Sequence, residues 1–415
     1  MKGLQFKSKK PDFVKDDHLN DKPVAIVMGL GMNGLSVCRS LGRIGFNVYV
    51  LLVEGNAGAE GLSRYIKHVF RPDKDAGDKE LLEMLAYIRS CFDQKPFLFA
   101  ISDRTSLFLS RYKDRLQNQY TFWANSIEVQ EQVINKEQLY AAAERLGIPA
   151  PKTWPIRNLD DVEKLLEIVQ LPVFVKPALA HIWKDQYVSD KVLNIDNKKV
   201  LREKLVEILS LNIEVMVQEI IPGADDTIYS AVMFMTASGE PWGLCCKRKL
   251  RQQPIGAGDG IFQMIVKCGP YVEDAIRLVR GLDYVGPASV EFRWDERDDQ
   301  VKLMEINARS LACQGLIAHA GINLPYLTYC YATGKVLPPM EAKVGTKWIA
   351  FERDFMSFRE GRRLGIINFR QWLFSYRDVN AFAFFAWDDP LPFLVRTVKF
   401  IWRGCKYLWR SYIHY

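Results

Sequence analysis

Three short apolar runs near the N-terminus constrain the fold more than any other feature of the sequence. They are Val24–Met28, Val48–Val53 and Phe97–Ile101, and each ends at a glycine or at polar residues. Continuous apolar runs of this length are typical of strands that are buried on both faces, as in parallel sheets. The sequence therefore predicts an α/β fold that begins with a Rossmann-like parallel sheet.

The overall composition narrows the class of protein. The chain has 415 residues, of which 48% are hydrophobic and 25% charged, so we expect a globular protein of two or three domains. No window approaches about 18 uncharged apolar residues, and the first 21 residues lack the apolar centre of a signal peptide. Eight scattered cysteines, with only Cys245 and Cys246 adjacent, favour reduced thiols. These features predict a cytoplasmic protein.

A glycine motif follows the first apolar run and has two interpretations. Gly29, Gly31 and Gly34 have the spacing of a dinucleotide-binding turn, and Glu54 lies about twenty residues further on. One interpretation is an NAD-dependent oxidoreductase or epimerase, in which Glu54 binds the ribose. In the other, the glycines only make a tight turn and allow the helix to pack. The rest of the chain contains no conventional hydride-transfer set.

A second candidate site lies near residue 300. Along Val301–Arg309 the residues alternate, so a strand would place Glu305, Asn307 and Arg309 on one face. Glu291 adds a carboxylate from another strand-like run. Hard oxygen ligands of this kind suit Mg²⁺, and a planar guanidinium suits anionic charge that develops in a reaction. The alternative is a surface strand with ordinary polar alternation.

Five motifs occur in a fixed order along residues 23–335. They are Asn135-Lys136, Phe174-Val-Lys-Pro177, Val217-Gln-Glu-Ile-Ile-Pro-Gly223, Glu291 and Glu305-x-Asn307-x-Arg309. In kind and in order they resemble the motifs of the ATP-grasp carboxylate–amine ligases. The resemblance implies an N-terminal Rossmann-like sheet, followed by a two-subdomain ATP-grasp fold of α+β type and a helical C-terminal tail.

The resemblance also implies roles for individual residues. Residues expected to bind ATP are Lys136 and Lys176 at the phosphates, Glu219 near the adenine amino group, the Ile220–Ile221 backbone as the hinge, and Asp226 at the ribose. One or two Mg²⁺ ions would lie on Glu291, Glu305 and Asn307, with Arg309 compensating charge. The glycine motif would then belong to a domain that often helps to hold the acceptor substrate rather than NAD.

Two segments depart from the pattern of the family or are ambiguous. The loop 177–184, which in the family is commonly glycine-rich, contains no glycine here. A third hypothesis is therefore a non-catalytic nucleotide-binding scaffold, whose loop no longer closes on ATP. In the segment 247–260 we expect Lys247 and Arg251 to contact anions, while a solvated run of charges is the alternative.

The chemistry implied by the resemblance needs no enzyme nucleophile. Phosphoryl transfer from ATP converts a carboxylate into an acyl phosphate, and an amine then displaces the phosphate. We therefore predict an ADP-forming ligase that joins a small-molecule carboxylate to an amine, with an amino acid as one substrate. No nucleic-acid partner is expected.

The C-terminal segment 391–415 contains five basic residues and no acidic one. Apolar residues recur there every three or four positions, with basic residues opposite and Trp402 and Trp409 at the edges. This pattern predicts an amphipathic helix on a membrane surface, which would make the protein peripheral at the inner face. Docking of the helix on the protein body is the alternative. Without these five charges the net charge of the chain falls from +7 to +2.

The sequence thus predicts six parts. They are a polar arm (1–22), a Rossmann-like domain (23–125), a small ATP-grasp subdomain (126–210), a large subdomain with the metal site (211–335), an aromatic-rich extension (336–390) and the basic helix (391–415).

Overall fold

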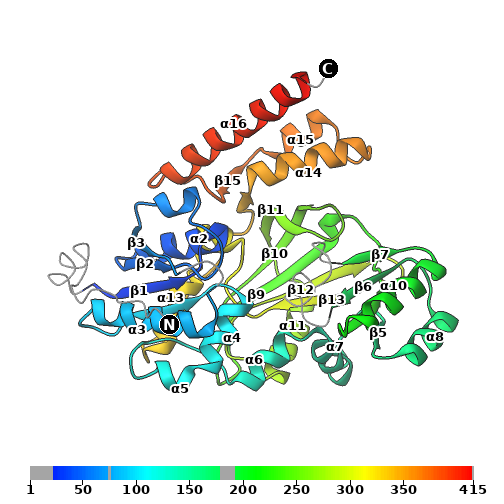
Figure 1. The fold of residues 1–415 in the computed structure, drawn as a ribbon, viewed down its shortest axis with the longest axis horizontal. Helices are drawn as coiled ribbons and strands as arrows, with labels where there is room; N and C mark the ends of the chain where they lie inside the picture. Colours follow the sequence, from blue (N-terminus) through cyan, green and yellow to red (C-terminus); the bar gives the residue numbers. More distant parts are fainter. Residues whose placement is uncertain (1–21, 73–75, 178–191, 414–415) are drawn as a thin grey trace. The chain divides into compact units, whose positions relative to one another are not determined.

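The computed structural model describes residues 22–72, 76–177 and 192–413, with side chains in the last helix described as far as Trp402. The chain forms two units, which Figure 1 shows coloured along the sequence. The first comprises Met1–Ala124, Arg309–Phe351 and Asp378–Tyr415, and the second comprises Asn125–Ala308 and Glu352–Arg377. The sequence-based division into six parts stays a prediction, and the two units combine its segments differently.

The first unit contains a parallel sheet with the strand order β3-β2-β1-β4. Its strands are β1 (Val24–Met28), β2 (Asn47–Leu51), β3 (Ile66–Phe70) and β4 (Phe97–Ala100). The predicted parallel sheet is therefore confirmed. Strand β3 was not predicted, because at the edge of the sheet it contains a lysine and a histidine and lacks a continuous apolar run.

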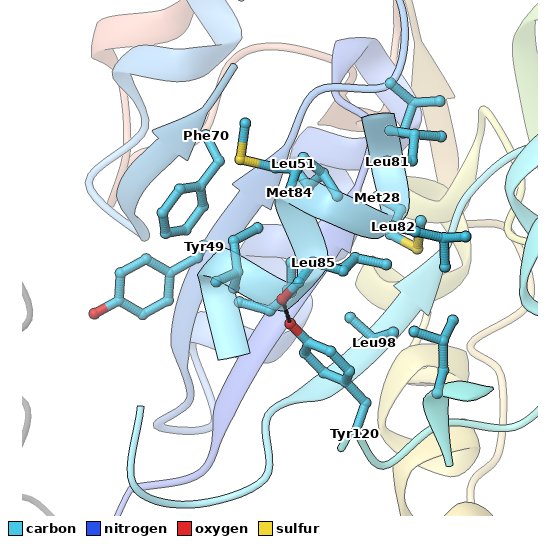
Figure 2. Packing of buried hydrophobic residues seen from close by; sticks show 14 of the residues in the cluster. Met28, Tyr49, Leu51, Phe70, Leu81, Leu82, Met84, Leu85, Leu98 and Tyr120 are labelled. Carbon is cyan, nitrogen blue, oxygen red and sulfur yellow. Dashed lines mark hydrogen bonds between the residues drawn. The ribbon is translucent and has the colours of Figure 1, made fainter. Parts of the chain in front are cut away.

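Both faces of this sheet are covered, which explains the unbroken apolar runs. On one face α3 (Asp78–Cys91) packs through residues that include Leu81 and Leu85, as Figure 2 shows. The hydroxyl of Tyr120 donates a hydrogen bond to the Leu85 carbonyl there. On the other face α2 (Gly31–Gly42) packs against alternate residues of the same strands.

The remaining elements of the first unit come from three stretches of the chain. They are η2 (Ala59–Leu62), α4 (Asp103–Arg111), α5 (Lys113–Leu116), α12 (Gln314–His319), α13 (Leu324–Ala332), the parallel pair β14 (Lys347–Ile349) and β15 (Val379–Phe382), and α16 (Leu391–Ile413). The last of these confirms the predicted C-terminal helix. Within the described residues, no helix combines the length and apolar character needed to cross a bilayer.

The second unit begins with a small antiparallel sheet of order β5-β8-β6-β7. Its strands are β5 (Thr153–Ile156), β6 (Val173–Pro177), β7 (Leu193–Ile195) and β8 (Val215–Glu219), and the nearby helices are α6 (Ile127–Ile134), α7 (Lys136–Arg145), α8 (Leu159–Ile168) and α10 (Lys198–Ser210). Asn135 caps α7, because its side chain accepts a hydrogen bond from the Gln138 amide.

A larger antiparallel array follows in the order β13-β12-β9-β10-β11. Its elements are η3 (Asp225–Thr227), β9 (Ile228–Met235), β10 (Pro241–Gln253), β11 (Asp259–Val266), α11 (Tyr271–Gly281), β12 (Gly286–Asp295) and β13 (Gln300–Asn307), and the unit ends with α14 (Phe351–Arg363) and α15 (Phe369–Ser375). Helix α11 packs on one face of the array. The candidate site lies on the opposite face of the array.

One cysteine prediction is wrong. Cys246 on β10 and Cys268 after β11 form a disulfide, with Cα atoms 5.1 Å apart. The two strands are hydrogen-bonded neighbours, which brings together cysteines that are 22 positions apart in the sequence. The five other cysteines with described side chains are free and buried: Cys38, Cys91, Cys245, Cys313 and Cys330.

Candidate nucleotide and metal site

The large sheet of the second unit has one apolar and one polar face. Two neighbouring rows of residues cross strands β13, β12, β9 and β10. The first row belongs to the core beneath α11 and consists of Ile306, Val290, Ala231 and Cys246. The adjacent row consists of Glu305, Glu291, Ser230 and Lys247. Because neighbouring residues in a strand point to opposite faces, these four side chains form one polar row.

Two carboxylates face each other in this polar row. Glu291 and Glu305 are direct cross-strand partners, a position in which like charges repel. The amide of Asn307 donates a hydrogen bond of 3.0 Å to Glu305. Lys249 lies 2.8 Å from Glu291, and the two side chains are only 8% and 11% exposed. The buried lysine therefore offsets the negative charge of the pair.

Lys249 is a candidate site residue that the sequence analysis missed. Burial lowers its pKa, but the charges of Glu291 and Glu305 outweigh burial and raise the pKa above the ordinary value. The lysine thus stays charged at neutral pH. A signal for it exists in the sequence, because Lys249 is two residues from Lys247 on the same strand and so shares its face.

Lys176 enters the site from β6 of the small sheet. Its ammonium group donates a 2.6 Å hydrogen bond to the side chain of Gln218. Burial, followed by the charge of Lys136, lowers the pKa of Lys176 to about 8, and the carboxylates of Glu305 and Glu291 offset part of this effect. The charged form of this half-buried lysine is stabilised when an anion such as a phosphate group binds beside it.

The three residues predicted to hold the metal fit Mg²⁺ in their chemistry. The structure brings Glu291, Glu305 and Asn307 together on two paired strands. Two carboxylates and an amide oxygen are hard ligands, and Mg²⁺ usually completes its shell with phosphate oxygens and water. In the part of the chain that the structure describes, no group of three or more His, Cys, Asp or Glu residues forms a metal cage. A metal in this site would thus depend on a bound nucleotide for ligands.

The predicted adenine hinge follows β8. The carboxylate of Glu219 accepts a hydrogen bond from the Lys152 amide and pairs with Arg297 at 2.5 Å. After the hinge, Gly223 has a φ of +131°, which favours glycine and turns the chain toward β9. Asp226 pairs with Arg248 at 2.8 Å. The roles of Glu219, Ile220–Ile221 and Asp226 toward adenine and ribose stay predictions.

The two predicted anion contacts on β10 have different surroundings. Lys247 donates a 3.0 Å hydrogen bond to Ser230 within the polar row. Arg251 forms a bidentate ion pair with buried Asp354, in which Nε lies 2.7 Å from Oδ1 and Nη2 lies 2.9 Å from Oδ2. The third nitrogen, Nη1, donates a hydrogen bond to the hydroxyl of Ser375. The guanidinium of Arg251 is therefore held inside the unit. A role for Arg251 in anion binding stays a prediction that must compete with this network.

Arg309 belongs to the first unit, because the division between the units falls directly before it. Its Nε donates a 3.0 Å hydrogen bond to Asp103. The next residue, Ser310, exchanges hydrogen bonds with the side chain of Asn33, which lies in the glycine turn after β1. The role of Arg309 in charge stabilisation stays a prediction. Of the predicted phosphate loop 177–184, residues 178–184 lie outside the described residues.

The geometry of the glycine motif favours the tight-turn interpretation. Gly29 has a φ of +117°, and a Cβ atom on Gly34 would lie 2.7 Å from the Gly29 carbonyl oxygen. Both glycines are therefore required for the turn itself. Glu54, the predicted ribose ligand of the NAD hypothesis, pairs with Arg104 at 3.1 Å.

A comparison with known proteins finds a similar ligase. No family model matches the chain. The chain is 25% identical over 323 residues to a D-aspartate ligase of Enterococcus faecium (strain Aus0004), a match that covers 74% of this chain and 75% of the ligase.

Solved structures show the same fold. An L-amino acid ligase from Bacillus licheniformis has a TM-score of 0.57 at 14% identity and covers 77% of this chain and 78% of its own. The N5-carboxyaminoimidazole synthetase of Staphylococcus aureus, solved with ADP, also has a TM-score of 0.57, at 16% identity and with 77% and 80% covered. The biotin carboxylase of Campylobacter jejuni has a TM-score of 0.59 at 15% identity, with 78% and 74% covered.

These matches confirm the predicted ATP-grasp fold and the predicted resemblance to carboxylate–amine ligases. The prediction of an ATP-dependent ligase is confirmed at this level of class. The relatives described above give no support to an oxidoreductase.

Proposed function

We propose that the protein uses ATP to convert a carboxylate into an acyl phosphate and joins it to an amine, with an amino acid as one substrate. The observation that carries the proposal is the polar row of Glu305, Glu291, Ser230 and Lys247, supplemented by Lys249. Its paired carboxylates and lysines suit a magnesium nucleotide and an anionic substrate. The similarity to a D-aspartate ligase makes a dicarboxylic amino acid the first substrate to test.

Each group would have a defined task in this reaction. Lys136 and Lys176 hold the phosphates of ATP, and Glu291, Glu305 and Asn307 hold Mg²⁺, which when bound neutralises phosphate charge. A carboxylate oxygen of the substrate attacks the γ-phosphorus and ADP leaves. The amine nitrogen then attacks the acyl carbon, phosphate leaves, and the amine loses a proton. Lys247, which donates a hydrogen bond to Ser230 in the polar row, would compensate the negative charge of the acyl phosphate.

The test is phosphate release by the purified full chain with ATP, Mg²⁺ and pooled amino acids that include D-aspartate and L-aspartate. Release that depends on an amino acid is expected. ATP binding without turnover would instead support the nucleotide-binding scaffold, and binding of NAD alone would support the oxidoreductase. Either outcome would overturn the ligase proposal.

The lowered pKa of Lys176 predicts a pH-dependent affinity for ATP. Lys176 is charged below pH 8 and loses its proton as the pH rises through about 8, so its attraction for phosphate is lost at alkaline pH. We expect the dissociation constant for ATP to rise about tenfold between pH 7 and pH 9. Calorimetric titration checks this, with Lys176→Arg as the control that stays charged. Equal pH profiles for the two proteins would contradict the prediction.

We also propose that helix α16 lies on a membrane surface. The described side chains Leu394, Val398, Ile401 and Trp402 are each more than half exposed. Near the start of the helix, Arg396 pairs with Glu60 at 2.7 Å and lies over the ring of Phe384. The helix is thus attached to its own unit near its start, while the described part of its apolar stripe is exposed, an arrangement that suits an interfacial helix.

Flotation with anionic vesicles tests the role of α16. The variant Val398→Ser/Ile401→Ser/Trp402→Ser should recover at least about tenfold less protein with the vesicles than the native chain, because apolar area buried in lipid is lost. The control, Leu62→Ser/Val336→Ser/Val344→Ser, changes three exposed apolar residues elsewhere in the same unit. Equal recovery of native protein and tail variant would refute the role of the tail.

A further inference from the structure

A second exposed apolar surface lies in the other unit, on the hairpin of helices α14 and α15 (Figure 1). The aliphatic and aromatic side chains at its tip and along α15 are between 54% and 74% exposed: Leu364, Ile366, Phe369, Leu373 and Phe374. Exposed apolar residues are common singly, but a cluster of five within eleven positions marks an interaction site.

Exposed arginines are interspersed with these apolar residues along the hairpin sequence. Arg359, Arg362, Arg363, Arg370 and Arg377 are all exposed. The segment 352–377 has six arginines and three acidic residues, a net charge of +3, and one of its acidic residues, Asp354, is fully buried. The hairpin therefore combines an exposed apolar tip with an excess of positive charge from these five arginines, which we call the arginine collar.

Buried contacts hold the hairpin from its inner side, and of the five exposed residues Phe369 also lies against them, with its ring centroid 6.2 Å from that of Phe358. The buried carboxylate of Asp354 accepts hydrogen bonds from Arg251 on β10 and from Trp372 and Tyr376 on or directly after α15. The rings of Phe358 and Trp372 stack at 4.5 Å. The hairpin is thus fixed from its inner side, and the tip and collar remain available for a partner.

We infer that the α14–α15 tip docks on a lipid surface with anionic headgroups. Apolar side chains of the tip enter the interface, and the arginines attract the anionic headgroups. A second copy of the chain fits less well, because a two-fold contact would place one arginine collar against the other. The inference does not depend on α16, which belongs to the other unit.

Flotation of the full chain with phosphatidylglycerol-containing and purely phosphatidylcholine vesicles tests the inference. The tip variant Leu364→Ser/Ile366→Ser/Phe374→Ser should lower recovery with anionic vesicles at least about tenfold. Its control is Leu159→Ser/Ile168→Ser/Leu211→Ser, three exposed apolar residues in the same unit. The collar variant Arg362→Gln/Arg363→Gln/Arg370→Gln should lose the preference for anionic vesicles, while Lys164→Gln/Lys199→Gln/Lys267→Gln should keep it.

All variants are prepared both with the native tail and with the tail variant described above, so that the two elements are measured separately. An effect of the tip variant in both backgrounds supports the inference, and recovery equal to that of its control overturns it. If the native chain is a dimer, and the tip variant is a monomer with unchanged flotation, the inference is overturned and the tip instead binds a second copy of the chain.

Amino-acid-dependent phosphate release without vesicles should stay within about twofold of native in every variant. A native chain that floats but lacks this activity would refute the proposed ligase and leave lipid docking intact.

Discussion

Glu305→Gln is expected to lower kcat/KM for ATP turnover by at least about a hundredfold. The substitution removes one of the two carboxylates in the predicted metal set and leaves Glu291 and the neutral Asn307. Mg²⁺ binds charged oxygen ligands far better than amide oxygens, and phosphoryl transfer depends on the metal for neutralisation of charge. Phosphate release at saturating amino acid, as a function of Mg²⁺ concentration, measures the effect.

The stability of Glu305→Gln separates loss of the site from loss of the fold. Because Glu305 and Glu291 are directly opposite each other, the substitution removes a like-charge repulsion, and the unfolding midpoint should stay equal or rise slightly. Glu240→Gln, an exposed carboxylate just before β10, is the matched control and should keep native turnover. Native turnover in Glu305→Gln would remove Glu305 from the metal site.

Local patterns in the sequence were enough to predict the candidate metal residues. Alternation along β13 placed Glu305 and Asn307 on one face, and the structure adds Glu291 as the direct partner of Glu305. This worked because strand periodicity fixes the face of each side chain without knowledge of the partner strand. The same holds for the parallel sheet, whose continuous apolar runs require cover on both faces.

Contacts between distant segments could not be predicted in this way. The pairing of Lys249 with Glu291 joins residues 42 positions apart, on strands β10 and β12, which are separated by β9 in the sheet. The pairing of Arg251 with Asp354 spans 103 positions, and that of Arg309 with Asp103 spans 206. Each charged residue in the sequence has many possible partners, and only the tertiary fold selects one.

Helices α14 and α15 were also missed, and the segment that contains them was described only as aromatic-rich. Their inward faces are held by polar groups and stacked rings, namely Asp354, Ser357, Phe358 and Trp372, rather than by a continuous aliphatic stripe. Their exposed faces carry phenylalanine and leucine. This distribution reverses the usual amphipathic pattern, so periodicity gave no clear signal.

The second large expected effect concerns the buried ion pair between Arg251 and Asp354. The Arg251 side chain is 13% exposed and that of Asp354 fully buried, so Arg251→Met leaves a buried carboxylate without its cation. Breaking such a pair costs about 3–5 kcal/mol of unfolding free energy. We expect this loss in urea unfolding, and recovery of most of it in the double variant Arg251→Met/Asp354→Asn, which removes both charges but keeps an acceptor oxygen for Trp372 and Tyr376.

An exposed pair of the same type is the control. Arg43 and Asp388 also make two hydrogen bonds, but their side chains are 43% and 40% exposed, so Arg43→Met should cost less than about 1 kcal/mol.

The sequence-based role of Arg251 as an anion contact predicts a different outcome, namely a raised KM for substrate with native unfolding free energy. That result would assign Arg251 to the substrate, whereas a loss of stability that the double variant repairs assigns it to the attachment of the α14–α15 hairpin.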